Sequence, residues 1–290
     1  MKTKAMGWGP FVGSLLLTVA CAPEDWGTAG DLPADEADAR LEAGALAEAP
    51  RSASLDAGLD LGIAKDGGDV VLSWSPLGDA VDYTVWHGDH AYWQPGDAGT
   101  VALTTGPQTS LAHAVAGDGN HHYYRVVAHA SGGDVVSTAV GKFSHRLHPG
   151  FNKLPQPLDT GLIEAQDLLA ELGGLAQGIH EYDATIQGFV STSFGYGLGE
   201  VPIAESSAAP NTVFEEVGRV PAEGELALPL ADGLNLVTVP LSMGDTTASA
   251  VLAAVAPAWR VGWWDPIAQD RVWHDGSSPD FAIAAGDDIY

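Results

Sequence analysis

The chain has 290 residues, of which 46% are hydrophobic and 17% are charged, a composition that can bury substantial cores and differs from that of a disordered protein. Asp and Glu total 38 against 12 Lys and Arg, so the formal net charge at pH 7 is −26. This charge repels phosphate backbones and anionic membrane surfaces, which excludes nucleic acid as a partner. The length allows two or three small domains.

The first 20 residues have the pattern of a signal peptide. Lys2 and Lys4 precede an uncharged run that begins at Phe11 and ends at Ala20, just before Cys21. The run is shorter than the roughly 20 apolar residues that a membrane-spanning helix needs. We therefore expect residues 1–20 to be removed and the protein to be exported to the bacterial cell envelope.

Cys21 is the only cysteine, so it has no partner for an internal disulfide. The segment Thr18-Val19-Ala20-Cys21 resembles the lipobox of bacterial lipoproteins. That resemblance implies that Cys21 is lipidated and that acyl chains anchor the protein at the outer membrane or cell surface. Thr18 departs from the family, which most often has leucine there, and an incidental cysteine near an ordinary cleavage site is the alternative.

Residues 21–57 are predicted to be a tether between the anchor and the first domain. The stretch is rich in Ala, Gly, Pro, Asp and Glu and has no period-two alternation. A short helix over residues 36–48 is an alternative. Its acidic residues lack the ligand spacing of an EF-hand, so calcium binding is disfavoured and no metal or cofactor is predicted.

Residues 58–147 are predicted to form a β-sandwich. Short alternating segments are separated by turn residues, and about seven strands fit this length. Val70, Leu72 and Trp74 share one face of a strand, while Val71 and Ser73 lie on the other.

Three segments of this region are similar to a known family. Residues 70–74 (VVLSW), 82–85 (DYTV) and 124–128 (YRVVA) resemble strands B, C and F of fibronectin type III domains. The resemblance implies a fibronectin type III-like sandwich with an inward Trp74, and a spacer or binding module rather than an enzyme.

Four aromatic residues are the candidate binding residues. Trp86, Tyr92 and Trp93 lie in or beside the connection after the strand at 83–86, where they could stack on sugar rings or peptides. Trp264 is a fourth candidate, because alternation places Trp259 and Trp263 on the opposite, core-facing side of its strand. The alternative interpretation is that these rings only cap the ends of β-domains.

Eight of the ten histidines lie between His87 and His148. Histidines three residues apart on a strand face opposite sides, so a zinc site would need a turn to bring them together. Polar strand faces and loops are the favoured interpretation, and no metal site is predicted.

The second half contains an internal duplication, with copies at residues 148–230 and 231–290. Residues 150–158 align with residues 233–241 at an offset of 83, which pairs Asn152 with Asn235, and the offset continues through a short amphipathic helix in each copy. Each copy is predicted to contain a strand, a short helix, a hairpin and two more strands. The later matches pair Ile203 with Ile283 and residues 213–214 with residues 289–290.

The two copies resemble a module found near the C-terminal ends of secreted bacterial multidomain proteins. It opens with a Gly-x-Asn strand that leads into Pro-Leu, and the resemblance supplies no function. A kelch repeat is the weaker alternative, because two units cannot close a propeller. Copy two stops at Tyr290, so either the natural chain ends on a short strand or this sequence is a truncated product.

No motif of nucleophilic, metal-dependent or nucleotide-dependent catalysis occurs in the sequence. The leading hypothesis is therefore a mainly β, non-catalytic envelope lipoprotein that displays adhesive or scaffold domains toward a surface protein or polysaccharide. The alternative is a carbohydrate- or substrate-binding accessory protein of the cell surface. An enzyme whose site is assembled from scattered residues ranks third.

Overall fold

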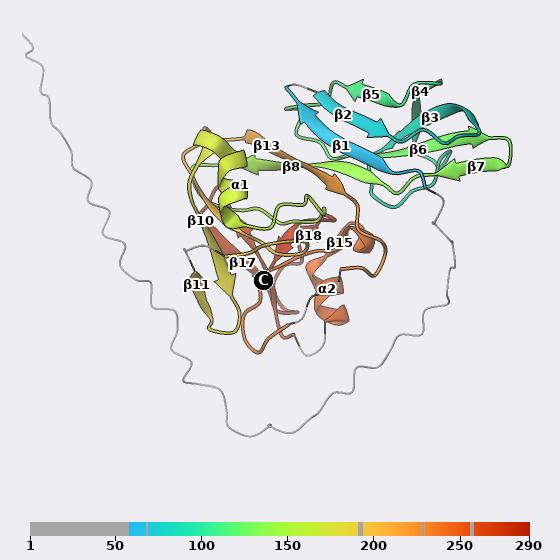
Figure 1. Ribbon diagram of the computed structural model, residues 1–290. Helices are drawn as coiled ribbons and strands as arrows, with labels where there is room; N and C mark the ends of the chain where they lie inside the picture. Colours follow the sequence, from blue (N-terminus) through green and yellow to red (C-terminus); the bar gives the residue numbers. More distant parts are fainter. Residues whose placement is uncertain (1–57, 68, 191–193, 227, 229, 256–257) are drawn as a thin grey trace, which may run out of the picture. The chain divides into compact units, whose positions relative to one another are not determined.

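The computed structural model describes residues 58–290 apart from residues 68, 191–193, 227, 229 and 256–257 (Figure 1). The predicted signal peptide, Cys21 and the tether lie outside the described residues. The described part is mainly β with two short α-helices, which confirms the predicted fold class. Within it, no helix is both long and apolar enough to cross a membrane.

Two antiparallel sheets form the first half of the described chain. Their strands are β1 (Leu61–Asp66), β2 (Asp69–Trp74), β3 (Ala80–Gly88), β4 (Val101–Gly106), β5 (Ser110–His113), β6 (His122–Ala130), β7 (Gly133–Val136) and β8 (Val140–Leu147). One sheet has the order β1-β2-β5, and the other contains β8-β6-β3-β4 with β7 also beside β6.

The two sheets pack through a shared hydrophobic core. Leu72 of β2, Val85 of β3 and Val126 of β6 are completely buried in it. Trp74 is also buried, with its ring 5.8 Å from that of Tyr83, as the alternating pattern predicts. The assignment of these sheets to the fibronectin type III family stays a prediction.

Each copy of the duplication contains one helix and several short strands. Copy one contains β9 (Gly150–Lys153), α1 (Ala165–Leu172), β10 (Ala176–Asp183), β11 (Gly188–Val190), β12 (Ile203–Ser206) and β13 (Thr212–Arg219). Copy two contains β14 (Val237–Thr238), β15 (Thr246–Thr247), α2 (Ala248–Ala254), β16 (Val261–Asp265), β17 (Asp270–His274), β18 (Ala282–Ile283) and β19 (Asp288–Ile289). Single 3-10 turns follow α1 at Gly173–Leu175 and precede α2 at Leu241–Met243.

The two copies share detailed local geometry. The side chain of Asn152 accepts a hydrogen bond from the backbone of His148 and donates to the carbonyls of His148 and Gly150. The side chain of Asn235 makes the same three bonds 83 residues later, to Ala231 and Gly233. The Gly-x-Asn segment is thus a repeated loop closed by its asparagine, which explains why this residue recurs.

The last strands of the two copies align differently from the prediction. Ile203 pairs with His180 in copy one, and the backbone of Tyr290 bonds in both directions to Gly262, which is the counterpart of His180. Tyr290 is therefore the counterpart of Ile203, an offset of 87. The predicted matches of Ile203 to Ile283 and of residues 213–214 to residues 289–290 are wrong, because a longer connection follows the hairpin in copy two.

Strand β13 of copy one adds to the sheet of the first half. It pairs antiparallel with β8 along all eight of its residues, from Thr212 opposite Leu147 to Arg219 opposite Val140, and the two strands run side by side in Figure 1. The strand pairing therefore crosses the domain boundary predicted at residues 147–148.

Candidate functional site

The three aromatic candidates of the first half do not form an exposed platform. The Trp93 side chain is only 2% exposed and packs so tightly on Gly88 that a Cβ atom there would lie 2.5 Å from the indole nitrogen. Tyr92 is half-buried and its hydroxyl donates a 2.8 Å hydrogen bond to the carbonyl of Pro221. Trp86 is partly buried within β3, in register with Arg125 of β6.

Trp264 has a different environment, because it lines a cavity of about 280 Å³. Its indole nitrogen donates a 2.8 Å hydrogen bond to the carbonyl of Phe151 in the Gly-x-Asn loop of copy one, which holds the ring in place. Trp259, predicted to be in the core, is instead 68% exposed. It precedes β16, so the strand alternation does not extend to it.

The cavity lies where the β16–β17 hairpin of copy two meets the Gly150–Asn152 loop of copy one. We call this contact the Lys153 seam. Its aromatic and charged or amide lining residues are Trp263, Trp264, Phe281, Arg146, Asn152, Lys153, Asp287 and Asp288. Both kinds of lining are needed for a ligand pocket, because apolar rings supply contact area while a few polar groups fix orientation.

Lys153 is the most unusual residue of this seam. Its side chain is 3% exposed, and its ammonium lies 2.9 Å from Asp288 Oδ2 and 3.2 Å from the centre of the Tyr290 ring. Neither the ammonium nor this carboxylate oxygen has a hydrogen-bond partner of regular geometry. Burial lowers the pKa of Lys153 to about 8 although the Asp288 charge opposes the change, so the group remains protonated at neutral pH.

The positive and negative charges that line the cavity nearly cancel. Arg146 and Lys153 contribute positive charge, and Asp287 and Asp288 contribute negative charge. Burial of its carboxyl group raises the pKa of Asp287 to about 6, partly opposed by a hydrogen bond that Asp287 accepts from the backbone of Ala284. The cavity therefore offers both hydrogen-bond donors and acceptors without a strong net field.

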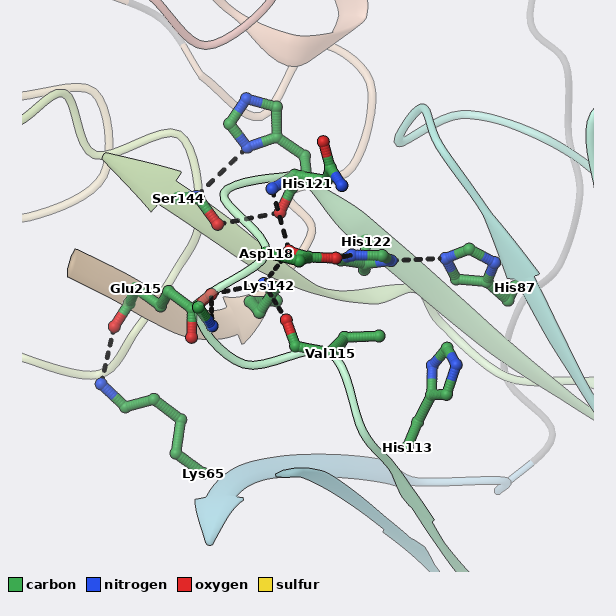
Figure 2. A network of polar contacts seen from close by, with 12 residues as sticks. Lys65, His87, His113, Val115, Asp118, His121, His122, Lys142, Ser144 and Glu215 are labelled. Atoms are coloured by element: carbon green, nitrogen blue, oxygen red, sulfur yellow. Dashed lines mark hydrogen bonds and ion pairs between the residues drawn. The ribbon is translucent and has the colours of Figure 1, made fainter. Parts of the chain in front are cut away.

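A second polar cluster lies around Lys142 of β8, whose side chain is fully buried (Figure 2). Its ammonium donates to the Val115 carbonyl at 2.7 Å, to Asp118 Oδ1 at 2.8 Å and to Glu215 of β13. Glu215 also accepts a hydrogen bond from the backbone of Gly117. The cluster thus fastens a loop of the first half and a strand of copy one to the same lysine.

Three histidines extend this cluster on the other side, as Figure 2 shows. His122 Nε2 lies 2.7 Å from Asp118 Oδ2, and His87 Nε2 lies 2.8 Å from His122 Nδ1. A carboxylate only accepts, so Nε2 of His122 donates the hydrogen bond to Asp118. His113 bonds instead to the Tyr124 hydroxyl at 3.0 Å.

The pKa values of His87 and Asp118 in this cluster are both lowered. Burial, reinforced by His122 and His113, lowers the pKa of His87 to about 4. Burial acts to raise the pKa of Asp118, but hydrogen bonds from Lys142, Asn120 and His122 outweigh it and hold that pKa well below its usual range. No group of three or more His, Cys, Asp or Glu side chains in the described residues is placed to hold a metal ion. The cluster is a tightly bonded polar network.

A third polar group is buried between β8 and two segments of copy one, β13 and the segment that follows β9. Glu216 of β13 is only 1% exposed, and it accepts hydrogen bonds from Gln156 at 2.9 Å and lies 2.9 Å from His145 Nε2. The His145 ring also contacts the rings of Phe143 and Phe214, with centroid distances of 5.2 and 5.9 Å. All three side chains are buried, so these contacts stabilise the packing of β13 against the sheet.

The sequence prediction of the site missed Lys153, Asp288 and Arg146. One signal could have identified the lysine: copy two has Leu236 at the position equivalent to Lys153, so a charged residue occurs where the duplicated fold accepts an apolar one. Asp288 could not be found this way, because its counterpart is hidden by the change of offset.

Comparisons with known proteins give no family. No protein-family model matches the chain, and no curated protein sequence matches it. The crystal structure of pectate lyase PelI from Erwinia chrysanthemi, in complex with tetragalacturonic acid, matches 29% of this chain and 28% of its own, at 18% identity and a TM-score of 0.25. Pectate lyase Pel3 from Pectobacterium carotovorum matches 36% of this chain and 32% of its own, at 17% identity and a TM-score of 0.26. At these TM-scores the likeness carries no argument about fold or activity.

Proposed function

We propose that the chain is a non-catalytic lipoprotein of the bacterial cell envelope, in which residues 58–290 act as a rigid scaffold that displays binding surfaces. The observation that carries the scaffold role is the pairing of β13 with β8 along its whole length. Buried polar contacts from Lys142 to Glu215 and from His145 to Glu216 reinforce this pairing, so copy one is joined to the first half at several points.

Anchoring rests on the signal-peptide pattern and on Cys21. The test is intact mass and membrane fractionation of the natively expressed protein beside a Cys21→Ser variant. We expect the wild type to begin at Cys21, carry acyl mass and fractionate with membranes, and the variant to lose all three properties. If both proteins are soluble and begin at another residue, the anchored form of the proposal is wrong.

A second candidate function, binding of a carbohydrate or another small substrate, is favoured by the cavity of the Lys153 seam. The cavity combines aromatic rings, a balanced set of charges and a buried ammonium with no regular hydrogen bond. Titration of the full chain with sugars, followed by tryptophan fluorescence, tests it. Saturable binding supports this function, and the absence of a response with every sugar opposes it.

A further inference from the structure

The duplication supplies a second seam to compare with the Lys153 seam. Here the β10–β11 hairpin of copy one meets the Gly233–Asn235 loop of copy two, and we call this contact the Leu236 seam. Gln269 of the copy-two hairpin accepts from the backbone of Phe151 at 2.8 Å and donates to its carbonyl. Gln187 of the copy-one hairpin makes the same pair of bonds to Leu234. Each hairpin thus binds the loop of the other copy through two hydrogen bonds of one glutamine.

Residues that build both seams are shared between the copies. Gln187 and Gln269 both adopt positive φ angles, of 51° and 53°, at the tips of their hairpins. Gly150 and Gly233 have φ of 100° and 96°, and a Cβ atom at either glycine would lie within 2.6 Å of the glutamine that grips it. The fold therefore needs these glutamines and glycines, with the loop asparagines, in both places.

The cavity residues differ between the seams. Lys153 has Leu236 as its counterpart, and Trp264 has Tyr182, whose hydroxyl is used in a bond to Gln187. The alignment of Tyr290 with Ile203 makes Val201 the counterpart of Asp288, so the charged pair of the Lys153 seam is replaced by two apolar residues in the Leu236 seam. Because the same backbone folds without these charges, the fold does not explain the Lys153–Asp288 pair.

Burying such a pair has a cost. Desolvation of an ammonium and a carboxylate opposes folding, and their attraction compensates only when hydrogen bonds satisfy the remaining protons and lone pairs. Here both charged atoms are buried and lie 2.9 Å apart without regular hydrogen-bond geometry, and their residues line the cavity. A ligand with hydroxyl groups would supply the missing partners, donating to Asp288 and accepting from Lys153.

We propose that the Lys153 seam binds a single neutral sugar ring, with Lys153 and Asp288 contacting its hydroxyl groups and Trp264 contacting its apolar face. This deepens the second candidate function and is independent of anchoring through Cys21. The cavity of about 280 Å³ lies just below the size range of most ligand pockets, which favours one ring over a longer chain. The balanced lining charges and the net charge of −26 disfavour an acidic ligand.

The experiment is a titration of the full chain with the methyl glycosides of glucose, galactose, mannose and N-acetylglucosamine, with methyl glucuronide as the acidic comparison. Binding is measured by calorimetry and by ligand-observed NMR. We expect at least one neutral glycoside to bind saturably at one site and more tightly than the glucuronide. No saturable binding of a neutral glycoside, or preference for the glucuronide, overturns the proposal.

Single and double substitutions test whether the glycoside binds in the Lys153 seam. Trp264→Ala should weaken binding about tenfold or more, because it removes the stacking ring. Tyr182→Ala in the Leu236 seam, and Trp259→Ala at an exposed ring outside the cavity, should leave affinity unchanged. The double variant Lys153→Leu/Asp288→Val copies the residues of the Leu236 seam, so it should fold normally yet lose binding. Binding that survives this double variant, or that depends on Tyr182, overturns the proposal.

These outcomes are distinct from a failure of the envelope proposal. Fractionation of the Cys21→Ser variant reports anchoring alone, while the titration reports the seam alone. A protein that is not lipidated yet binds a glycoside at Trp264 contradicts only the anchor.

Discussion

The two seams of the duplicated region have nearly the same backbone and very different side chains. In both, a hairpin glutamine grips the Gly-x-Asn loop of the other copy, and an asparagine closes that loop with three hydrogen bonds. The Lys153 seam contains two tryptophans, a buried ammonium and a cavity of about 280 Å³, and in the Leu236 seam a leucine takes the place of the lysine. The difference separates residues that both seams share from residues that this fold does not require.

The copies also differ in how they meet the rest of the chain. In copy one, Gln156 donates to the buried carboxylate of Glu216 on β13. The counterpart of Gln156 in copy two is Val239, which is buried in an apolar cluster. Copy one is thus specialised for attachment to the first half through β13, and this polar attachment is where the largest effect of a single substitution is expected.

Glu216→Ala should cost about 3–5 kcal/mol of unfolding free energy, because it leaves His145 and Gln156 buried without their shared partner. Urea denaturation monitored by circular dichroism measures the loss. Glu205→Ala, on an exposed position of β12, is the control and should change stability by no more than about 0.5 kcal/mol. Equal stability of the two variants would contradict the attachment role of Glu216.

Asn152→Ala should cost about 2–3 kcal/mol, since Asn152 is 2% exposed and three hydrogen bonds are lost in a buried loop. Asn235→Ala removes the same three bonds from a partly exposed loop, where water replaces them, so about 1 kcal/mol is expected. The comparison is made by denaturation of both variants under the same conditions. A larger loss at Asn235 would show that burial does not set the difference.

The double variant Lys153→Leu/Asp288→Val should unfold at the same stability as the wild type or up to about 2 kcal/mol higher, because apolar replacement of a buried ion pair removes its desolvation cost. Lys153→Leu alone should be less stable than the double variant, since Asp288 then lacks its counter-charge. If the double variant is the least stable of the three proteins, the pair has a structural role and the contrast between the seams is weaker than proposed.

Gly150→Ala and Gly233→Ala should each lower the free energy of unfolding by about 1–2 kcal/mol, and the two losses should be similar. Both positions have φ near 100°, which disfavours any side chain, and both added Cβ atoms meet the end of a glutamine. Thermal unfolding of the matched pair tests the equivalence of the loops. A large loss at only one glycine would contradict it.

Asp287→Asn tests the pH dependence of the Lys153 seam. The folded pKa of Asp287, about 6, lies above the unfolded value near 3.9, so its contribution to stability is greatest below pH 4 and is lost as pH rises to about 6. The asparagine should therefore raise stability above pH 6 relative to the wild type and change little at pH 4. Asp287 is exposed overall, so water screening limits the expected gain to less than about 1 kcal/mol. Melting temperatures at pH 4 and pH 7.5 measure it, and a gain at both pH values would contradict titration as the cause.

Local pattern alone determined much of the architecture. Alternation correctly placed Val70, Leu72 and Trp74 in a core, because successive strand residues face opposite sides. The offset of 83 correctly paired the helices, whose residues Ala165 and Ala248 are both buried. Both signals depend only on neighbours within a few residues or on direct repetition, so they can be read without knowing which strands pair.

Only the tertiary structure decided how the pieces meet. Three features depend on contacts between residues distant in the chain. They are the pairing of β13 with β8, the hydrogen bonds of each hairpin glutamine to the loop of the other copy, and the burial of Trp93. The cavity also depends on such contacts, because Trp264 and Lys153 lie in different copies and converge only when the copy-two hairpin grips the copy-one loop. Alternation tells which face of a strand is apolar, but the partner that covers that face is set by the packing of the whole chain.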